Sequence, residues 1–157
     1  MEAPSKPRYE IHDQISEWLA QMRKAAAFLY GEATSAEIAA LANFYQREVR
    51  PHFAYEEQRL FPALRRLDPA PELHQALAEF EREHVVLIEK LDPLIEDLRA
   101  IAKGLLSGPQ LVDISRRARL VIDLLLLHAA QEDDVMLPLF ERYGTDMQRE
   151  LAKGDAI

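Results

Sequence analysis

Two stretches of the sequence place a histidine and a glutamate four residues apart. They read HFAYEEQRLFP at 52–62 and HAAQEDDVMLP at 128–138, an offset of 76 positions. Positions i and i+4 of an α-helix lie on one face, so each pair can direct an imidazole nitrogen and a carboxylate oxygen to a single point. The two pairs are His52 with Glu56 and His128 with Glu132. Inward-facing groups of these types hold metal ions in helical bundles.

Two further histidines lie on apolar helical stripes. His12 precedes Ile15 and Leu19, and His84, 72 residues later, precedes Leu87 and Leu91 with the same spacing. We therefore expect each of four helices to carry one inward-facing histidine. Together with the two glutamates, these side chains offer enough nitrogen and oxygen to hold two metal ions bridged by the carboxylates. His74, about 15 Å from His84 along a helix, is expected at the surface.

A structural role is the alternative for each of these residues taken alone. A lone histidine on an apolar stripe is commonly a hydrogen-bonded core residue, and a lone His-x3-Glu pair is commonly on the surface. Four of the five histidines, however, occupy equivalent stripes. Burying two carboxylates without a positive partner would cost several kcal/mol. Glu57 and Asp133 are expected to face solvent or a neighbouring helix. The less favoured alternative is that their carboxylates contact the metal-binding residues and orient them.

The elements that must position these residues are helices, because apolar residues recur at spacings of three and four throughout. Thr34 and Glu37 form a capping box, and Gly144 predicts a helix end. We expect an all-α fold, an up-down-up-down antiparallel four-helix bundle with an approximate twofold repeat of a helical hairpin. The expected helices span about 8–30, 34–67, 68–103 and 107–144, with prolines 51, 62, 93 and 138 inside them or near their ends. Residues 1–157 would form a single domain with its core at about 8–143, and 1–7 and about 146–157 would be loose.

Composition narrows the class of function. The chain has 157 residues, of which 48% are hydrophobic, enough for one core, and its net charge of −8 leaves no basic stripe for nucleic acid or anionic membrane. Without cysteine there can be no thiolate metal site, so a metal would be held by nitrogen and oxygen. The polar N-terminus and the lack of a long apolar run indicate a soluble, cytoplasmic protein.

At these residues the chain resembles the hemerythrin-like, or HHE cation-binding, family. The motifs are His12, His52-Phe-Ala-Tyr-Glu56, His84 and His128-Ala-Ala-Gln-Glu132, followed in the second helix by a family-like EE..LFP. The resemblance covers roughly 8–143. It implies a non-heme di-iron centre with oxo or hydroxo bridging, in which His12 and His52 hold one iron, His84 and His128 hold the other, and both glutamates bridge.

The sequence departs from the oxygen carriers of that family at Phe80, where they have a further histidine four residues before the position of His84. We expect a stand-alone protein that binds or senses O2, NO or peroxide, or iron itself, with a homodimer as an open possibility. A di-iron oxidase or peroxidase, with Tyr45 near the site, is the first alternative. The second is a metal-free helical interaction module that associates through residues 124–127.

Overall fold

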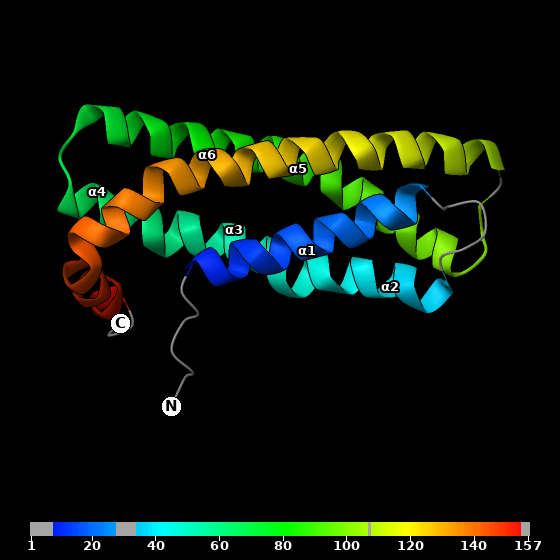
Figure 1. Ribbon diagram of the computed structural model, residues 1–157, viewed down its shortest axis with the longest axis horizontal. Helices are drawn as coiled ribbons and strands as arrows, with labels where there is room; N and C mark the ends of the chain where they lie inside the picture. The colour runs from blue at the N-terminus through cyan, green and yellow to red at the C-terminus, as the bar shows by residue number, and fades with distance from the viewer. Residues whose placement is uncertain (1–7, 28–33, 107, 155–157) are drawn as a thin grey trace.

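The computed structural model describes residues 8–27, 34–106 and 108–154, and these form four helical rods packed side by side (Figure 1). The first rod is α1 (Arg8–Ala27), the second contains α2 (Ser35–Phe44), α3 (Arg50–Tyr55) and α4 (Phe61–Leu67), the third is α5 (Pro71–Ala102) and the fourth is α6 (Gly108–Gly154). No strand occurs in these described ranges, which confirms the expected all-α class. Within the same ranges, no helix has the length and apolarity needed to cross a bilayer.

The second rod is continuous because two π-helical turns accommodate its prolines. These turns are η1 (Tyr45–Val49) and η2 (Glu56–Leu60). The amide of the residue after each turn bonds to a carbonyl five residues back, Arg50 to Tyr45 and Phe61 to Glu56. Pro51 and Pro62 follow directly. Proline has no amide hydrogen and its ring crowds the carbonyl four residues earlier, so a widened turn lets the helix continue. The rod reaches Leu67, as the sequence predicts.

The ends of the second and third rods follow local sequence signals. The Glu37 amide donates to Thr34 Oγ1 at 3.2 Å and the Thr34 amide donates to the Glu37 carboxylate at 3.4 Å, which confirms the capping box. Helix α5 begins at Pro71 and ends two residues before Gly104, whose φ of 71° suits glycine. The predicted end of the first helix near Gly31 lies outside the described residues.

The predicted end of the fourth helix at Gly144 is wrong. Helix α6 continues to Gly154, so the residues expected to be loose from 146 onward are helical as far as the structure describes them. Their inner face packs on the second rod. Met147 is buried, and the Arg59 guanidinium donates to the Leu151 carbonyl at 2.9 Å. These contacts outweigh the roughly 1 kcal/mol that a glycine costs inside a helix. In Figure 1 the last part of α6 turns across the end of the bundle beside α4.

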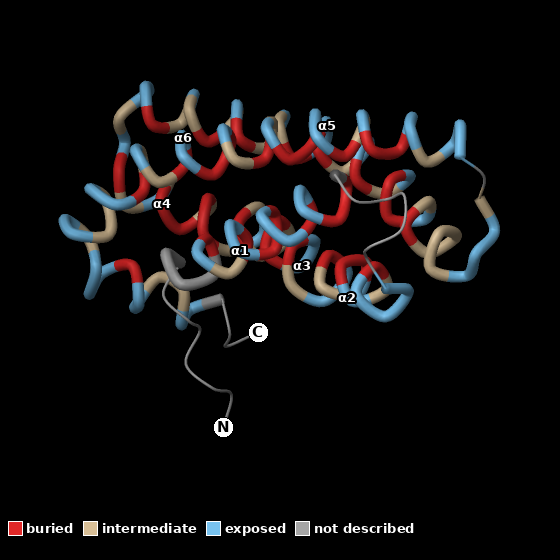
Figure 2. The backbone as a smooth tube through the Cα atoms, turned by 45° about the vertical axis from the view of Figure 1, so that its right-hand side comes forward, coloured by how far each residue is buried: buried red, intermediate tan, exposed pale blue. Residues whose placement is uncertain are grey.

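Two apolar clusters fill the interior, and buried backbone lines the inner side of every rod (Figure 2). The larger cluster, built around Trp18, Leu91 and Ile122, includes Phe53. The smaller cluster includes Phe61. The His84 ring stacks on Phe53 with a centroid distance of 4.3 Å and on Phe61 with 6.0 Å. The polar residues of the candidate site therefore lie where the two clusters meet.

Candidate metal centre

The structure brings all six predicted ligands together in the interior. Their exposed fractions are 5% for His12, 8% for His52, 0% for Glu56, 0% for His84, 3% for His128 and 1% for Glu132. They make two groups of potential ligands, each with donor atoms within 4.8 Å of one another. The first group contains His12, His52, Glu56 and Glu132, and the second contains Glu56, His84, His128 and Glu132. Both glutamates belong to both groups, which is the arrangement that two carboxylate-bridged metal ions need.

The individual distances show how Glu56 reaches both groups. Its Oε1 lies 2.8 Å from His52 Nε2, one turn earlier in the same rod. Its Oε2 lies 3.1 Å from His84 Nε2 on α5. Because the two oxygens of this one carboxylate point to different groups, Glu56 can bridge without changing its rotamer.

Glu132 has a similar position on α6. Its Oε1 is 3.5 Å from His12 Nε2 on α1 and also 3.5 Å from His128 Nε2, one turn earlier on its own helix. Its Oε2 is 3.7 Å from His84 Nε2. The carboxylate thus contacts histidines from both groups, as the Glu56 carboxylate does.

Three more carboxylates surround the group and contact the outer ring nitrogens. Asp133 Oδ1 lies 2.5 Å from His12 Nδ1, Glu57 Oε1 lies 3.0 Å from His84 Nδ1, and Glu83 Oε2 lies 2.5 Å from His128 Nδ1. An ionised carboxylate only accepts hydrogen bonds, so each of these nitrogens donates its proton. The bond fixes the tautomer and leaves the lone pair of Nε2 directed inward, as metal-binding histidines require.

These outer carboxylates correct the sequence-based expectation. Glu57 and Asp133 are partly exposed and reach neighbouring rods, as expected, but their carboxylates orient His84 and His12, which was the less favoured alternative. Glu83 was not identified from the sequence. A signal existed for the first two, because Glu57 and Asp133 are separated by the same 76 positions as the His-x3-Glu pairs.

The repeat also predicts where the pattern breaks. The position 72 residues before Glu83 is Ile11, so the chain has no carboxylate there to serve His52 as Glu83 serves His128. Among the described residues, no carboxylate contact to Nδ1 of His52 is seen. His52 Nε2 lies 2.8 Å from Glu56 Oε1 without a hydrogen bond, and the His52 ring contacts the His12 ring edge-on with a centroid distance of 5.3 Å.

The residues present fit a metal cation. The Nε2 atoms of His84 and His128 are 3.0 Å apart, and both rings have a carboxylate on Nδ1. If both rings carry their protons on Nδ1, the lone pairs of the two Nε2 atoms face and repel each other. A positive charge between the two nitrogens removes this repulsion. Burial lowers the pKa of His84, but Glu132 and Glu56 outweigh this effect and raise it to about 10. In the metal-free protein, a proton on His84 thus supplies charge that a metal would supply when bound.

The raised pKa of His84 gives the metal-free protein a distinctive pH dependence. A raised folded-state pKa adds stability that is complete below the unfolded pKa of about 6.5 and is lost as pH rises through the folded value. The folded value is about 10. The melting temperature of metal-free protein should therefore fall across that interval, as circular dichroism can measure. His84→Gln should flatten the fall, and His74→Gln, outside both groups, should retain it. An equal fall in both variants would contradict the assignment to His84.

Three other residues singled out in the sequence have clear positions. Phe80 is buried, and its ring packs edge-on against His128 with a centroid distance of 5.7 Å. The Tyr45 hydroxyl donates to Asp92 Oδ1 at 2.6 Å. Burial, together with Asp92, raises the pKa of Tyr45 and keeps the phenol neutral. His74 lies outside both groups, with Nε2 2.8 Å from the Asp68 carbonyl.

The fold and the site together define a cation-binding helical protein with nitrogen and oxygen ligands. The family model for the hemerythrin HHE cation binding domain matches residues 8–140 of the sequence. The chain therefore belongs to the hemerythrin family. This membership confirms the resemblance seen at the four histidine motifs. No curated protein and no solved structure matches the chain.

Proposed function

We propose that the protein is a non-heme di-iron protein that binds or senses a small ligand, O2, NO or peroxide, or responds to iron itself. One iron would be held by His12 and His52 and the other by His84 and His128. The observation that supports this most is that both ligand groups contain Glu56 and Glu132. A single metal ion would need only one of the groups, and a structural polar core would not need to bury two shared carboxylates.

The chain's own residues would bind, orient and shield the metals. Bound iron would supply redox chemistry and positions for a small ligand. The outer carboxylates keep three imidazoles in the tautomer that can bind metal. Phe53, Phe61 and Phe80 stack on or pack against the His84 and His128 rings and exclude water from that side. Exclusion of water strengthens each electrostatic contact in the site.

Metal analysis tests the proposal directly. Protein purified after growth with ample iron should contain about two iron atoms per chain, as expected for a bundle with two such ligand groups. It should also show near-ultraviolet charge-transfer bands when oxidised. His84→Ala should lose metal, whereas His74→Ala should retain both ions because His74 lies outside the site. One zinc ion per chain and no iron would refute the di-iron assignment.

A di-iron oxidase or peroxidase is the second candidate, favoured by Phe80 in the place of a further nitrogen ligand. A vacant coordination position is what turnover of an oxidant requires. Steady consumption of peroxide or O2 with a reductant would distinguish an enzyme from a binder. The metal-free interaction module is disfavoured, because the family binds cations.

The order of the helices, the hairpin repeat and the cellular location are part of the same proposal. Short connections between successive rods support an up-down-up-down order, and the matching contacts His12–Asp133 and His84–Glu57 support a twofold repeat of a helical hairpin. We infer a protein that acts in the cytoplasm on a small diatomic ligand or peroxide, without nucleic acid or membrane. The acidic charge of −8 supports the last two exclusions.

Phe80→His should add a nitrogen ligand to the metal held by His84 and His128. The Phe80 ring already contacts His128, so an imidazole at this position can reach the same metal after a small adjustment. We expect slower loss of that metal to chelators and shifted charge-transfer bands. The melting temperature of metal-free protein should fall, because a large ring leaves the core. Unchanged metal retention and an unchanged spectrum would show that residue 80 does not face the metal.

A further inference from the structure

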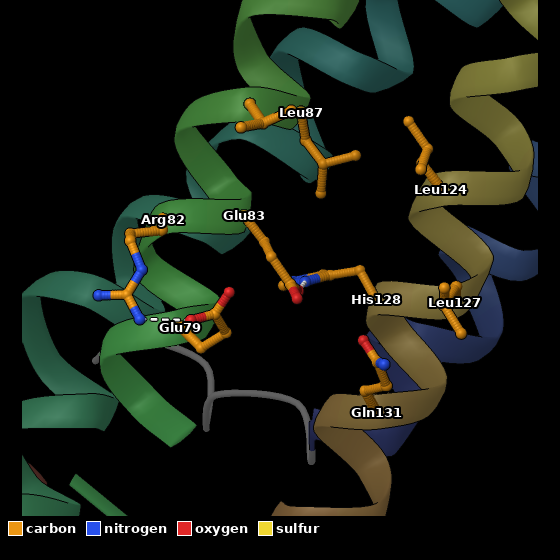
Figure 3. Close-up of a pocket in the computed structure, with 9 residues that line it drawn as sticks. Glu79, Arg82, Glu83, Leu87, Leu124, Leu127, His128 and Gln131 are labelled. Carbon is orange, nitrogen blue, oxygen red and sulfur yellow. Dashed lines mark hydrogen bonds and ion pairs between the residues drawn. The ribbon is translucent and has the colours of Figure 1, made fainter. Parts of the chain in front are cut away.

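An exposed apolar surface lies on the outer side of α5 and α6. Val86 on α5 and Leu120 and Leu127 on α6 are 47%, 53% and 56% exposed. Val86, Leu124 and Leu127 line one pocket between the two helices, and Figure 3 shows Leu124 and Leu127 on successive turns of α6. Leu120 lies one turn before Leu124 and two turns before Leu127, so it shares their side of α6. These four residues form the α5–α6 face, and exposed apolar surfaces of this kind mark interaction sites.

Charged residues flank Val86 on α5 in a regular order. Arg82 and Glu83 lie four and three residues before it, and Glu89 and Lys90 lie three and four residues after it. At about 100° per residue, Arg82 and Glu89 lie on one flank of Val86, and Glu83 and Lys90 lie on the other, each about 40–60° away. Each flank therefore carries one positive and one negative charge. The order of the two signs on one flank is the reverse of the order on the other.

This order of charges is complementary to itself when two copies of α5 cross in opposite directions. If a twofold axis passes near Val86, each charged residue lies across from the residue on the same flank at the other side of Val86. Arg82 would then lie across from Glu89 of the partner subunit, and Glu83 would lie across from Lys90 of the partner subunit. The axis repeats each contact, so four ion pairs would surround the centre.

The leucines of α6 lie at the level of the same axis. Along this face α5 and α6 run in opposite directions. Glu83 contacts His128, so Val86, three residues further along α5, lies about level with the midpoint between Leu124 and Leu127 on α6. A twofold axis at this level that brings α5 onto α5 of the second copy also brings α6 onto α6, and the apolar residues of both helices become covered.

The α6 sequence is complementary to itself about this level. Leu124 would lie across from Leu127 of the partner subunit, which places apolar side chains opposite each other. Arg116 lies eight residues before Leu124, and Asp134 lies seven residues after Leu127; both are exposed. Eighteen residues, or five full turns, separate Arg116 from Asp134, so the two lie on the same side of α6. Each would lie across from the other in the partner subunit, and the two helices thus indicate one common axis.

We propose that the α5–α6 face binds a second copy of this chain in an antiparallel, symmetric dimer whose twofold axis passes near Val86. Apolar residues form its centre and ion pairs form its rim, the usual order in protein interfaces. Arg82 already pairs with Glu79, and Glu83 with His128. A guanidinium has five N–H donors and a carboxylate has two oxygens, so both residues can keep these contacts in the dimer. The proposal concerns the protein chain and does not rest on the proposed metals.

Sedimentation of metal-free protein over a range of concentrations tests the dimer. The parent should reach about twice the 18.0 kDa mass of one chain. Val86→Glu and Leu127→Glu should each give a monomer, because they place a charge in the apolar centre of the interface. Val85→Glu and Leu137→Glu are the matched controls, since these residues are 55% and 46% exposed but lie outside the pocket, and the dimer should be retained. A parent that is monomeric at every concentration, or equal dissociation in the controls, would overturn the proposal.

Exchange of two charges tests the position of the axis. Arg82→Glu and Glu89→Arg should each raise the Kd of the dimer about tenfold, because like charges replace the ion pairs across the interface. The double variant Arg82→Glu/Glu89→Arg should return to the parent Kd. The two residues are about 10.5 Å apart along α5, too far to pair within one chain, so this recovery requires the second copy. Circular dichroism checks that each variant is folded. A double variant as weak as the single variants would overturn the antiparallel dimer.

Discussion

Glu56→Gln should lower metal affinity by at least about a hundredfold, roughly 2.7 kcal/mol. Glutamine keeps the size and shape of the side chain but removes the negative charge and one good metal ligand. Because Glu56 belongs to both ligand groups, both metals should be affected, so iron content should fall well below two per chain. Iron analysis after dialysis against a chelator of known affinity measures the change.

The metal-free form of the same variant should also lose stability. Glu56 is fully buried within 4 Å of His52 and His84, and Glu132 adds a second carboxylate to the same interior. Glu56 is one of the two carboxylates that raise the pKa of His84, so Glu56→Gln weakens a buried ion pair and should melt below the metal-free parent at neutral pH. Glu89→Gln, at an exposed position of α5, is the matched control and should retain both irons. A Glu56→Gln protein with two tightly held irons would exclude a bridging role.

Neutralising each outer carboxylate should weaken the binding of one metal and leave the other metal unaffected. Loss of a carboxylate that orients a metal-binding histidine costs about 10- to 100-fold in affinity. Asp133→Asn acts on His12 and should therefore release the metal of the first group faster. Glu57→Gln and Glu83→Gln act on His84 and His128, and both should release the metal of the second group faster. Chelator-driven iron loss, followed as two kinetic phases, measures each effect.

Asp134→Asn provides a close control, since Asp134 is the exposed neighbour of Asp133 on α6. Its two kinetic phases should match those of the parent. If Asp133→Asn accelerated both phases equally, the outer carboxylates would act on the whole bundle and not through single histidines. If Glu57→Gln and Glu83→Gln affected different phases, the grouping of His84 with His128 would be wrong.

Much of the site follows from the sequence by itself. Within one helix, the spacing of side chains fixes which of them share a face, so His52 with Glu56 and His128 with Glu132 could be paired without a structure. The apolar stripe around each histidine predicts its burial, and the repeat at 72 to 76 positions indicates that the rods carry equivalent groups. The capping box at Thr34 is equally local, because its two hydrogen bonds join residues three apart.

Contacts between rods were decided only by the tertiary structure. Whether Glu83 reaches His128 depends on the rotation and axial position of α5 against α6, which the packing of the whole core sets and no local spacing encodes. Gly144 shows the same limit, because the burial of Met147 against the second rod keeps α6 helical past a residue that locally favours an end. Sequence spacing determined which residues are candidate ligands, and the relative placement of the rods determined which carboxylates contact their outer nitrogens.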